Sequence, residues 1–570
     1  MTPRLGGIVV AACLAGGLAA GATLQVESFK PITDAVLLDP DPSDWINWRR
    51  TLDGWGYSPL DQITRENVAT LQLVWSWAKP PGTDEGTPLV YDGIMYLPGR
   101  RSIQALDAAT GDFIWEYTPS ATDGTTSSDR PPSLARRNIA IYDDKIFAAT
   151  SDAHLIAIDA TTGTPVWDHR VADRTLGYSY SSGPIIVKGK VVAGITGCTR
   201  YKDDVCFISA HDAQTGRELW RTSTIARPGE AGGDTWGDLP LAFRAGSDAW
   251  LPGSYDPQTD LIYWSTAQAK PWASAQRGTD GAALYTNSTL AIDPETGDIS
   301  WYFQHIPAET HDLDEAFETV LVDDGPRQSL FKMGKIGVLW ELDRRTGAFL
   351  NAFDLGYQTV VDINPISGQG ILRPEVVPRL GVPVDYCPGR GGLKNLWAMA
   401  YHPETRAFYI PLTPGCAEDA VYYAMPERRE VGGGGMGESE RPFVAHPASP
   451  NHLGDFVAMD SQTGEILWRR RSRLPYGTSA LTTGGGLVFV GDFDRYFYAF
   501  DVETGTQLWQ TRAPTALDGF PITYAVDGRQ YLAVASGAGW FVAWPNVLDV
   551  FPDVHQPIGD PVIQVFALPE

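Results

Sequence analysis

Residues 105–115, ALDAATGDFIW, contain the motif that decides the fold: an aspartate, a threonine three residues later, a glycine next, and a tryptophan eight residues after the aspartate. The complete motif occurs at Asp107/Thr110/Gly111/Trp115, Asp159/Thr162/Gly163/Trp167, Asp212/Thr215/Gly216/Trp220, Asp293/Thr296/Gly297/Trp301, Asp460/Thr463/Gly464/Trp468 and Asp501/Thr504/Gly505/Trp509. A seventh copy, Asp343/Thr346/Gly347, has Asn351 in place of the tryptophan. We expect Asp and Thr to hydrogen-bond a turn in which Gly takes a positive φ, and the following strand to carry Trp to a neighbouring unit.

Such repeats predict closure into a ring. One four-stranded unit cannot bury both of its faces alone, and radial stacking removes the exposed strand edges. Two gaps between copies, 212–293 and 343–460, are much longer than the others, so they must hold degenerate blades, long loops or both. We therefore predict an all-β, eight-bladed β-propeller with tryptophan-docking repeats, with seven blades as the alternative. Functional residues are expected in the long gaps, and loops 221–249 and 415–450 are expected to shape an entrance.

Composition supports this prediction and excludes one class of partner. The chain has 570 residues with 59 glycines, 42 prolines and 19 tryptophans, as expected for many short strands joined by turns. Its formal net charge of −25 argues against nucleic acid, because phosphate binding needs a basic surface. An acidic surface can steer a basic electron-carrier protein, although the alternative is a surface that only confers solubility.

The N-terminus reads as a secretory signal. Arg4 precedes the apolar run 8–22, which ends in small residues typical of a cleavage site and is short for a membrane span. We predict a signal peptide at 1–22, a single propeller domain at 23–570, and no membrane span. A lipoprotein box ending at Cys13 is a weaker alternative.

Four cysteines follow the signal, and their even number in an exported protein suggests two disulfides. The simplest pairing joins Cys198 to Cys206 and Cys387 to Cys416. No cysteine begins a CxxC or CxxCH motif, so neither covalent haem nor a zinc site is expected.

Three parts of the chain together resemble a known family. The repeats, the leader 31–64 and the block 305–315, HIPAETHDLDE, resemble the PQQ-dependent (quinoprotein) alcohol dehydrogenases, from about residue 31 to the final VFALPE. The resemblance implies an eight-bladed propeller that holds pyrroloquinoline quinone (PQQ) and a metal ion near its axis. The leader, the segment 198–206 and the C-terminal end look most similar to the sorbose/sorbosone dehydrogenase type.

The resemblance implies a cofactor pocket, position by position. Arg137 matches an arginine that pairs with a cofactor carboxylate, and Trp250 matches the aromatic floor on which the quinone stacks. The other implied contacts are Glu85, Thr150, Thr196, Gly197, Lys335 and Asn395. A single residue of these types in a propeller more often packs or caps the scaffold, so the prediction rests on the joint fit of all of them in order.

The sequence departs from the family at three positions. Pro131 and Pro132 replace a vicinal cysteine pair that covers the cofactor, a role that a Cys198–Cys206 disulfide could partly fill. Thr199 stands where a metal-binding glutamate is usual, and Gln268 where an asparagine ligand is usual.

The resemblance assigns the acidic stretch to the reaction centre. Asp312 corresponds to the catalytic base and Asp314 to an extra ligand of lanthanide-using members. The implied metal ligands are thus Gln268, Asp312, Asp314 and Thr199, holding Ca²⁺ or a lanthanide ion. Without a cation the two carboxylates would repel each other. The alternative is a solvated loop in which one aspartate caps a turn.

The implied function is periplasmic oxidation of a primary, secondary or sugar alcohol. The metal polarises the quinone, Asp312 accepts the hydroxyl proton and hydride moves to the quinone. An external acceptor such as a soluble cytochrome c would receive the electrons, because the chain has no haem motif. One rival is a non-catalytic periplasmic propeller scaffold with the same structural repeats. A weaker rival is a hydrolase or lyase that uses the carboxylates alone.

Overall fold

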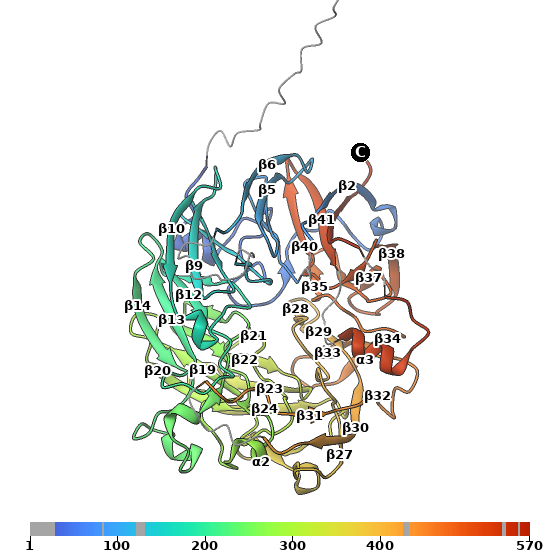
Figure 1. The fold of residues 1–570 in the computed structure, drawn as a ribbon. Helices are drawn as coiled ribbons and strands as arrows, with labels where there is room; N and C mark the ends of the chain where they lie inside the picture. Colours follow the sequence, from blue (N-terminus) through green and yellow to red (C-terminus); the bar gives the residue numbers. More distant parts are fainter. Residues whose placement is uncertain (1–28, 82–84, 121–131, 426–431, 538–542, 557–558) are drawn as a thin grey trace, which may run out of the picture.

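Antiparallel sheets follow one another around a common centre in the computed structural model (Figure 1). The structure describes residues 29–81, 85–120, 132–425, 432–537, 543–556 and 559–570. The predicted signal peptide at 1–22 and Pro131 lie outside these residues. The all-β propeller-type fold predicted from the repeats is therefore present. Among the residues that the structure describes, no helix has both the length and the apolar character needed to cross a membrane.

The first half of the chain forms four sheets, each of four strands. They are β3 (Leu89–Tyr91), β4 (Ile94–Pro98), β5 (Ile103–Asp107) and β6 (Phe113–Tyr117); β7 (Ala140–Tyr142), β8 (Lys145–Ala149), β9 (His154–Asp159) and β10 (Pro165–Arg170); β11 (Ile185–Val187), β12 (Lys190–Gly194), β13 (Phe207–Asp212) and β14 (Glu218–Ser223); and β16 (Ser254–Asp256), β17 (Leu261–Ser265), β19 (Ser288–Ile292) and β20 (Ile299–Gln304).

The second half continues the pattern. Its sheets are β21 (Thr319–Asp324), β22 (Arg327–Met333), β23 (Val338–Asp343) and β24 (Phe349–Asp354); β28 (Ala400–His402), β29 (Ala407–Leu412), β33 (Gly454–Asp460) and β34 (Ile466–Ser472); and β35 (Leu481–Thr483), β36 (Leu487–Gly491), β37 (Tyr496–Asp501) and β38 (Gln507–Arg512), with β1 (Tyr57–Ser58) parallel to β35.

The two ends of the chain share one sheet. Strand β2 (Gln72–Ala78) pairs antiparallel with β42 (Val562–Ala567), which pairs with β41 (Arg529–Gly537); β41 also pairs with β40 (Ile522–Val526) and β39 (Ala516–Leu517). Figure 1 shows the blue β2 beside the red C-terminal strands. The last sheet of the ring is thus completed by a strand from the N-terminal part of the chain.

The long gaps between motif copies carry the remaining elements. These are β15 (Ala245–Gly246) with β18 (Ala269–Lys270), β25 (Val361–Ile363) with β26 (Gly370–Leu372), and β27 (Val384–Tyr386), β30 (Gly415–Tyr422), β31 (Ser439–Glu440) and β32 (Phe443–Ala445), besides helix α2 (Ser274–Arg277). Two further helices, α1 (Asp34–Leu38) and α3 (Ala543–Val550), lie near the chain ends, and short 3₁₀ turns occur at Val68–Thr70, Arg174–Leu176, Gly233–Trp236, Leu241–Phe243 and Pro374–Val376.

The motif turns have the expected local structure. Asp107 accepts a hydrogen bond from the Thr110 N–H at 2.8 Å, and Gly111 has φ +78°. A Cβ on Gly111 would lie 2.7 Å from the ring of Trp75, so only glycine leaves room for that indole. Trp115 repeats the arrangement on the next turn, where its indole donates to the Ala160 carbonyl at 3.0 Å.

The copy without tryptophan uses a different aromatic residue. Asn351 instead donates to Glu341 at 3.1 Å. Phe353, two positions later on β24, packs against the next turn, where a Cβ on Gly464 would lie 2.2 Å from its ring. The strand alternates faces at every residue, so a shift of two keeps the aromatic ring on the same face.

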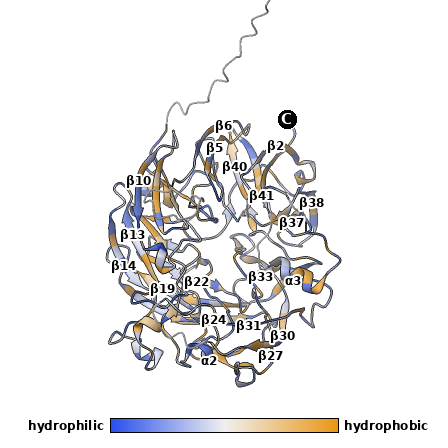
Figure 2. Cartoon of the chain, viewed as in Figure 1, coloured by the Kyte–Doolittle hydropathy of each residue, from blue (hydrophilic) through white to orange (hydrophobic). Residues whose placement is uncertain are grey.

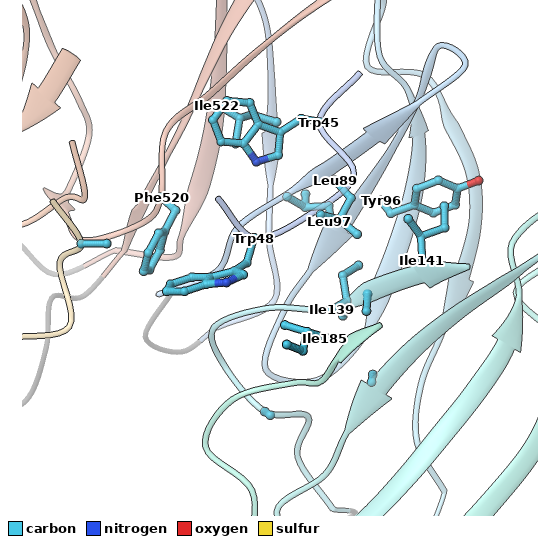
Figure 3. Close-up of a cluster of buried hydrophobic side chains, with 14 of the residues drawn as sticks. Trp45, Trp48, Leu89, Tyr96, Leu97, Ile139, Ile141, Ile185, Phe520 and Ile522 are labelled. Atoms are coloured by element: carbon cyan, nitrogen blue, oxygen red, sulfur yellow. The ribbon is translucent and has the colours of Figure 1, made fainter. Parts of the chain in front are cut away.

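The leader fills the space between the sheet that closes the ring and its neighbours. Trp45 pairs through its backbone with Val90, and the Trp48 ring lies 5.9 Å from that of Phe520 (Figure 3). Middle strands such as β9 are buried almost throughout, whereas outer strands such as β10 are largely exposed and more hydrophilic (Figure 2). The hydrophobic effect therefore holds each sheet chiefly through its middle strands and stacked faces.

Candidate functional site

A cavity of about 630 Å³ collects most of the residues singled out from the sequence. Its lining residues are Arg137, Ser181, Thr196, Gly197, Thr199, Asp248, Trp250, Lys270, Trp272, Asp312, Asp314, Lys335, Arg390, Gly391, Met436, Arg441 and Pro545. They come from connections throughout the ring, far apart in the sequence. This volume is in the range of small-molecule sites.

Trp250 and Arg137 form one wall of the cavity. Trp250, between β15 and β16, is half-buried, and its carbonyl accepts a hydrogen bond from the hydroxyl of Ser182 at 2.6 Å. The guanidinium carbon of Arg137 lies 4.9 Å from the centre of the indole ring. Phe317 meets the same indole edge-on at 5.0 Å. The indole is thus fixed on several sides while remaining part of the cavity surface.

Glu85 lies behind this wall and fixes Arg137. Its carboxylate is fully buried and 3.0 Å from the Arg137 guanidinium. The backbone is tied in the same place, because the Thr87 N–H donates to the Arg137 carbonyl at 2.8 Å. The Arg137 side chain is held by a partner that does not itself line the cavity.

Thr196 and Gly197 continue the wall after β12. The Thr196 hydroxyl donates to the Ser179 carbonyl at 2.8 Å. Gly197 has φ +79°, and a Cβ there would lie 2.0 Å from the Gly177 carbonyl oxygen, so no side chain fits. The chain can pass close to the cavity here only as glycine.

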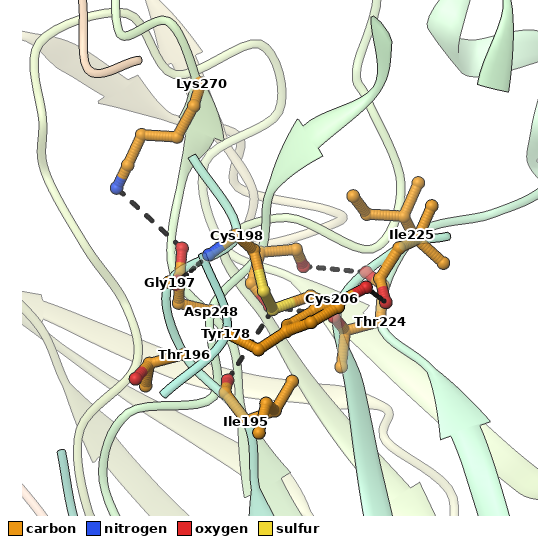
Figure 4. Close-up of a disulfide and its surroundings, with 12 residues drawn as sticks. Tyr178, Ile195, Thr196, Gly197, Cys198, Cys206, Thr224, Ile225, Asp248 and Lys270 are labelled. Atoms are coloured by element: carbon orange, nitrogen blue, oxygen red, sulfur yellow. Dashed lines mark hydrogen bonds and ion pairs between the residues drawn. A yellow bond between two sulfur atoms is a disulfide. The ribbon is translucent and has the colours of Figure 1, made fainter. Parts of the chain in front are cut away.

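Both disulfides predicted from the sequence are present. Cys198 and Cys206 are bonded with their Cα atoms 5.7 Å apart, and Cys387 and Cys416 with theirs 4.3 Å apart. The Cys198–Cys206 bridge is buried directly behind Gly197 (Figure 4). Neither of its cysteines lines the cavity.

Two predicted cofactor contacts lie away from the cavity surface. Asn395 is buried and donates to the carbonyl of Gly391, which does line the cavity, at 2.6 Å. Thr150 ties the turn between β8 and β9, donating to Asp152 at 2.5 Å and accepting from the His154 N–H at 3.1 Å. Asn395 thus supports the wall, whereas the structure does not bring Thr150 to it.

The acidic stretch enters the cavity between two anchored neighbours. His311 is buried, stacks on Tyr386 with ring centres 3.9 Å apart, and hydrogen-bonds Tyr422 at 2.9 Å. The Leu313 carbonyl accepts from the Asn287 side chain at 2.9 Å. Asp312 between them has φ +75°, a conformation that non-glycine residues rarely adopt and that occurs often at functional sites.

Asp312 is surrounded by donors. The Lys335 ammonium lies 3.4 Å from its carboxylate and hydrogen-bonds its carbonyl at 2.9 Å. The Arg441 guanidinium is 3.4 Å from its second oxygen, and the Gln268 amide nitrogen donates to the first. Asp314 forms its own ion pair with Lys335 at 2.8 Å. One ammonium therefore bridges the two carboxylates.

The two aspartates have opposite pKa shifts. Burial disfavours the charged form of Asp312, but the cations Lys335, Arg441 and Lys270 outweigh it and hold its pKa below the ordinary value. Burial, together with the charge of Asp312, raises the pKa of Asp314 despite its pairing with Lys335. Asp312 is the member of the pair that stays ionised and able to accept a proton.

The two glutamates of the stretch have structural partners. Glu309 is buried and accepts from the Leu313 N–H at 3.1 Å and from the His311 N–H, and burial raises its pKa to about 7. Glu315 is fully buried beside Lys332 at 3.4 Å, and burial likewise raises its pKa to about 7. Neither lines the cavity.

The residues of the cavity fit PQQ, a planar quinone with three carboxylates. Trp250 offers a flat surface for stacking, and five cationic side chains line the cavity: Arg137, Lys270, Lys335, Arg390 and Arg441. The Nε of Arg137 is buried without a hydrogen-bond partner among the described residues. A guanidinium with a free donor suits a carboxylate ligand.

The four expected metal ligands do not fit a calcium or lanthanide ion. Asp312 and Asp314 are already paired with Lys335, Thr199 offers only a neutral hydroxyl, and Gln268 turns its amide nitrogen towards Asp312. Ca²⁺ requires six to eight oxygen ligands. A hard cation at this place would have to displace the Lys335 ammonium or share both carboxylates with it.

Several lining residues were not singled out in the sequence. Asp248 and Arg441 belong to loops 221–249 and 415–450, which were expected to shape the entrance, so the region but not the residue was predicted. Lys270 and Trp272 follow Gln268 by two and four residues, and a cationic residue so close to an expected metal ligand was a signal that could have been used. Arg390 lies outside those loops, where no local pattern marks it.

The chain matches one family model and many known proteins. The model described as "Glucose/ethanol/alcohol dehydrogenase, beta-propeller domain" matches residues 45–354 and 443–532. The quinoprotein alcohol dehydrogenase PedH of Pseudomonas putida is 32% identical, with 94% of this chain and 93% of that protein covered. The dehydrogenase subunit of the alcohol dehydrogenase (quinone) of Acetobacter aceti is 31% identical, with 88% and 72% covered.

Solved structures agree with the sequence matches. A europium-containing methanol dehydrogenase superposes with a TM-score of 0.85 at 26% identity, covering 94% of this chain and all of that one. The quinohemoprotein alcohol dehydrogenase ADHIIG of Pseudomonas putida HK5 has a TM-score of 0.83 at 28% identity, covering 94% and 82%.

Proposed function

Because this chain belongs to the PQQ-dependent (quinoprotein) alcohol dehydrogenase family, we propose that it binds PQQ in the cavity beside Trp250 and oxidises an alcohol there. The observation that carries the proposal is that Trp250, Arg137 and Asp312 line one cavity although more than 170 residues separate the first and last of them. A scaffold propeller has no use for that combination. The family consists of enzymes, which favours catalysis over the scaffold alternative.

The residues of the wall hold the cofactor. Trp250 stacks on the ring system, and Arg137, oriented by Glu85, binds a carboxylate. Thr196, by its hydroxyl, and Gly197, by its backbone, would contact the bound cofactor, and Lys335 would contact its quinone oxygens. Asn395 supports the lining residue Gly391. A cofactor contact by Thr150 remains a prediction, because its hydroxyl already donates a hydrogen bond to Asp152 within the β8–β9 turn.

Asp312 acts as the base. When bound, PQQ supplies a quinone that accepts a hydride from the carbinol carbon of the substrate. Asp312 takes the hydroxyl proton as that C–H bond breaks, so the alcohol loses two electrons and two hydrogens and becomes a carbonyl compound. Lys335 and Arg441 keep Asp312 ionised for this task.

The predicted Ca²⁺ or lanthanide ion has one supporting observation, the europium in a similar solved enzyme. In this chain Lys335 already pairs with Asp312 and Asp314, and the amide of Gln268 donates to Asp312, which argues against a metal ion at this place. Cofactor binding by Trp250 and Arg137 and proton acceptance by Asp312 require no metal ion.

Electron transfer and location follow from wider features of the chain. The net charge of −25 favours docking of a small basic carrier such as a soluble cytochrome c. Two disulfides favour an oxidising compartment, which agrees with export to the periplasm by the signal peptide at 1–22. The eight radial sheets favour eight blades over seven.

The sorbose/sorbosone type is the proposed subgroup, with primary, secondary and sugar alcohols as substrate classes.

Cofactor release tests the proposal. Protein made with PQQ supplied is denatured, and the absorbance and fluorescence of the released small molecule are measured. One PQQ per chain and dye-linked oxidation of alcohols or sugar alcohols are expected. Protein that binds no PQQ under these conditions would contradict the function.

A further inference from the structure

Lys270 places a cation in the part of the cavity where the family resemblance implies a metal ion. It ends β18, two residues after Gln268, and its side chain is only 8% exposed. Its ammonium lies 3.9 Å from the Asp248 carboxylate (Figure 4), and it lines the cavity together with Asp312 and Asp314. Within the described part of the chain its ammonium makes no hydrogen bond, so the N–H donors of the side chain are available to a ligand in the cavity.

Asp248 holds this ammonium in place. One carboxylate oxygen of Asp248 accepts a hydrogen bond from the Cys198 N–H at 3.0 Å. The other is buried, makes no hydrogen bond to any described residue, and is the oxygen that faces Lys270. The disulfide to Cys206 fixes Cys198 in turn. A lysine in this setting has a charge that is compensated by a buried carboxylate.

The charged side chains of the cavity also favour a lysine ammonium over a bound metal ion at this place. Three carboxylates, Asp248, Asp312 and Asp314, face the ammonium groups of Lys270 and Lys335, besides the Arg441 guanidinium. By the family resemblance, the neutral Thr199 replaces a glutamate ligand, and the extra carboxylate of Asp314 is already paired with Lys335. Lys270 adds a positive charge beside Gln268, and a cation gained at this place is the change expected when an ammonium replaces a metal ion.

We infer that the Lys270 ammonium replaces the metal ion as the electrophile of the reaction. It donates a hydrogen bond to the cofactor oxygen on which negative charge builds as the hydride arrives. Asp312 still takes the hydroxyl proton, so protons and electrons balance as before. The inference rests on the proposed function, because it requires PQQ in the cavity.

Metal analysis of the holoenzyme tests the inference directly. Apoenzyme is treated with EDTA, reconstituted with PQQ in metal-free buffer, and dialysed against CaCl₂ or LaCl₃. We expect less than about 0.1 metal ion per chain by mass spectrometry, and less than a twofold change in kcat on adding either salt. One tightly bound ion per chain, or an inactive metal-free holoenzyme restored by either salt, would overturn the inference.

Lys270→Met supplies the second test, with Lys190→Met as matched control, because Lys190 is an ion-paired lysine that does not line the cavity. We expect Lys270→Met to bind PQQ and keep its Tm, to lose kcat about 100-fold or more, and to lower the midpoint potential of the bound cofactor in a redox titration. The potential is the readout that a merely structural lysine would leave unchanged. Unchanged kcat and potential would refute the role of Lys270. Failure of the wild type to bind PQQ would instead refute the function itself.

Discussion

The Lys335 ammonium lies 2.8 Å from the carboxylate of Asp314 and is shared with Asp312 at 3.4 Å, so one lysine sets the charge of both acids. Burial alone would favour protonation of both. The lysine tips the balance towards an ionised Asp312, while Asp314 has a raised pKa. Proton acceptance is thereby assigned to one member of the pair.

Asp312→Asn removes the base without changing the size of the side chain. We expect kcat to fall by about 10²–10⁴-fold, the usual contribution of a positioned general base, while one PQQ per chain remains bound. Stopped-flow reduction of the bound cofactor by alcohol, with absorbance for PQQ content, measures both quantities. A near-normal kcat would rule out Asp312 as the base.

Lys335→Met should move the acid limb of the pH–rate profile. The lysine is one of the cations that offset burial and depress the pKa of Asp312, so its loss raises that pKa. As the pH is lowered, Asp312 is then protonated earlier, and the acid limb moves to higher pH. The profile of kcat/KM between pH 3 and 8 measures the shift. Lys335→Arg keeps the charge and serves as control. An acid limb that moves equally in both variants would contradict this electrostatic role.

Arg137→Lys should weaken PQQ binding while preserving charge. A lysine cannot reproduce the planar fork that Glu85 orients, and we expect Kd for PQQ to rise about tenfold or more. Fluorescence titration of the apoenzyme measures it. Arg136→Lys is the matched control, because Arg136 is more exposed and lies 3.7 Å from Glu85. Equal losses in both variants would refute a specific role for Arg137.

Trp250→Ala should cost about 1–2 kcal/mol of PQQ binding, or about tenfold in Kd, through lost stacking. Trp250→Phe retains a flat ring and should bind more tightly than the alanine variant. Titration with PQQ compares the two. If both variants bind like the wild type, the cofactor does not stack on this indole.

Glu309→Gln should change how stability depends on pH. Burial raises the pKa of Glu309 from 4.5 to about 7, so its contribution to stability is full below about pH 4.5 and is lost as the pH rises through 7. The variant has no such loss. Relative to wild type, it should gain up to about 3 kcal/mol between pH 5 and pH 8.

Urea unfolding at the two pH values measures this gain. Glu375→Gln, which removes an exposed carboxyl, should show no such difference. The expectation fails if the stability of Glu309→Gln relative to wild type is the same at pH 5 and pH 8.

Local spacing predicted the scaffold well. The turn around Asp107 and Gly111 and the docking partner of Trp115 depend on residues near in sequence or at a constant period. Phe353 was missed because the repeat was matched at the single position of Asn351, whereas the strand needs only an aromatic ring on the correct face.

The cavity was predicted less completely, because its wall is assembled across the ring. The family resemblance led to Arg137, Trp250, Asp312 and Lys335, which do meet there. Neither Lys270 nor Arg441 was predicted as an individual residue, and their importance comes from the charges that tertiary structure places opposite them. The role of a charged residue depends on its neighbours in the tertiary structure, which the order of residues in the sequence does not reveal.

The pairing of β2 with β42 determines when during synthesis the ring can close. Strand β2 is synthesised long before its partner β42, so the ring can close only after β42 has been made. Until then β2 has a free edge, which is a site for wrong pairing between chains. Deletion of β42 would leave the edge of β2 unpaired, and we expect such a chain to aggregate before it can bind any ligand.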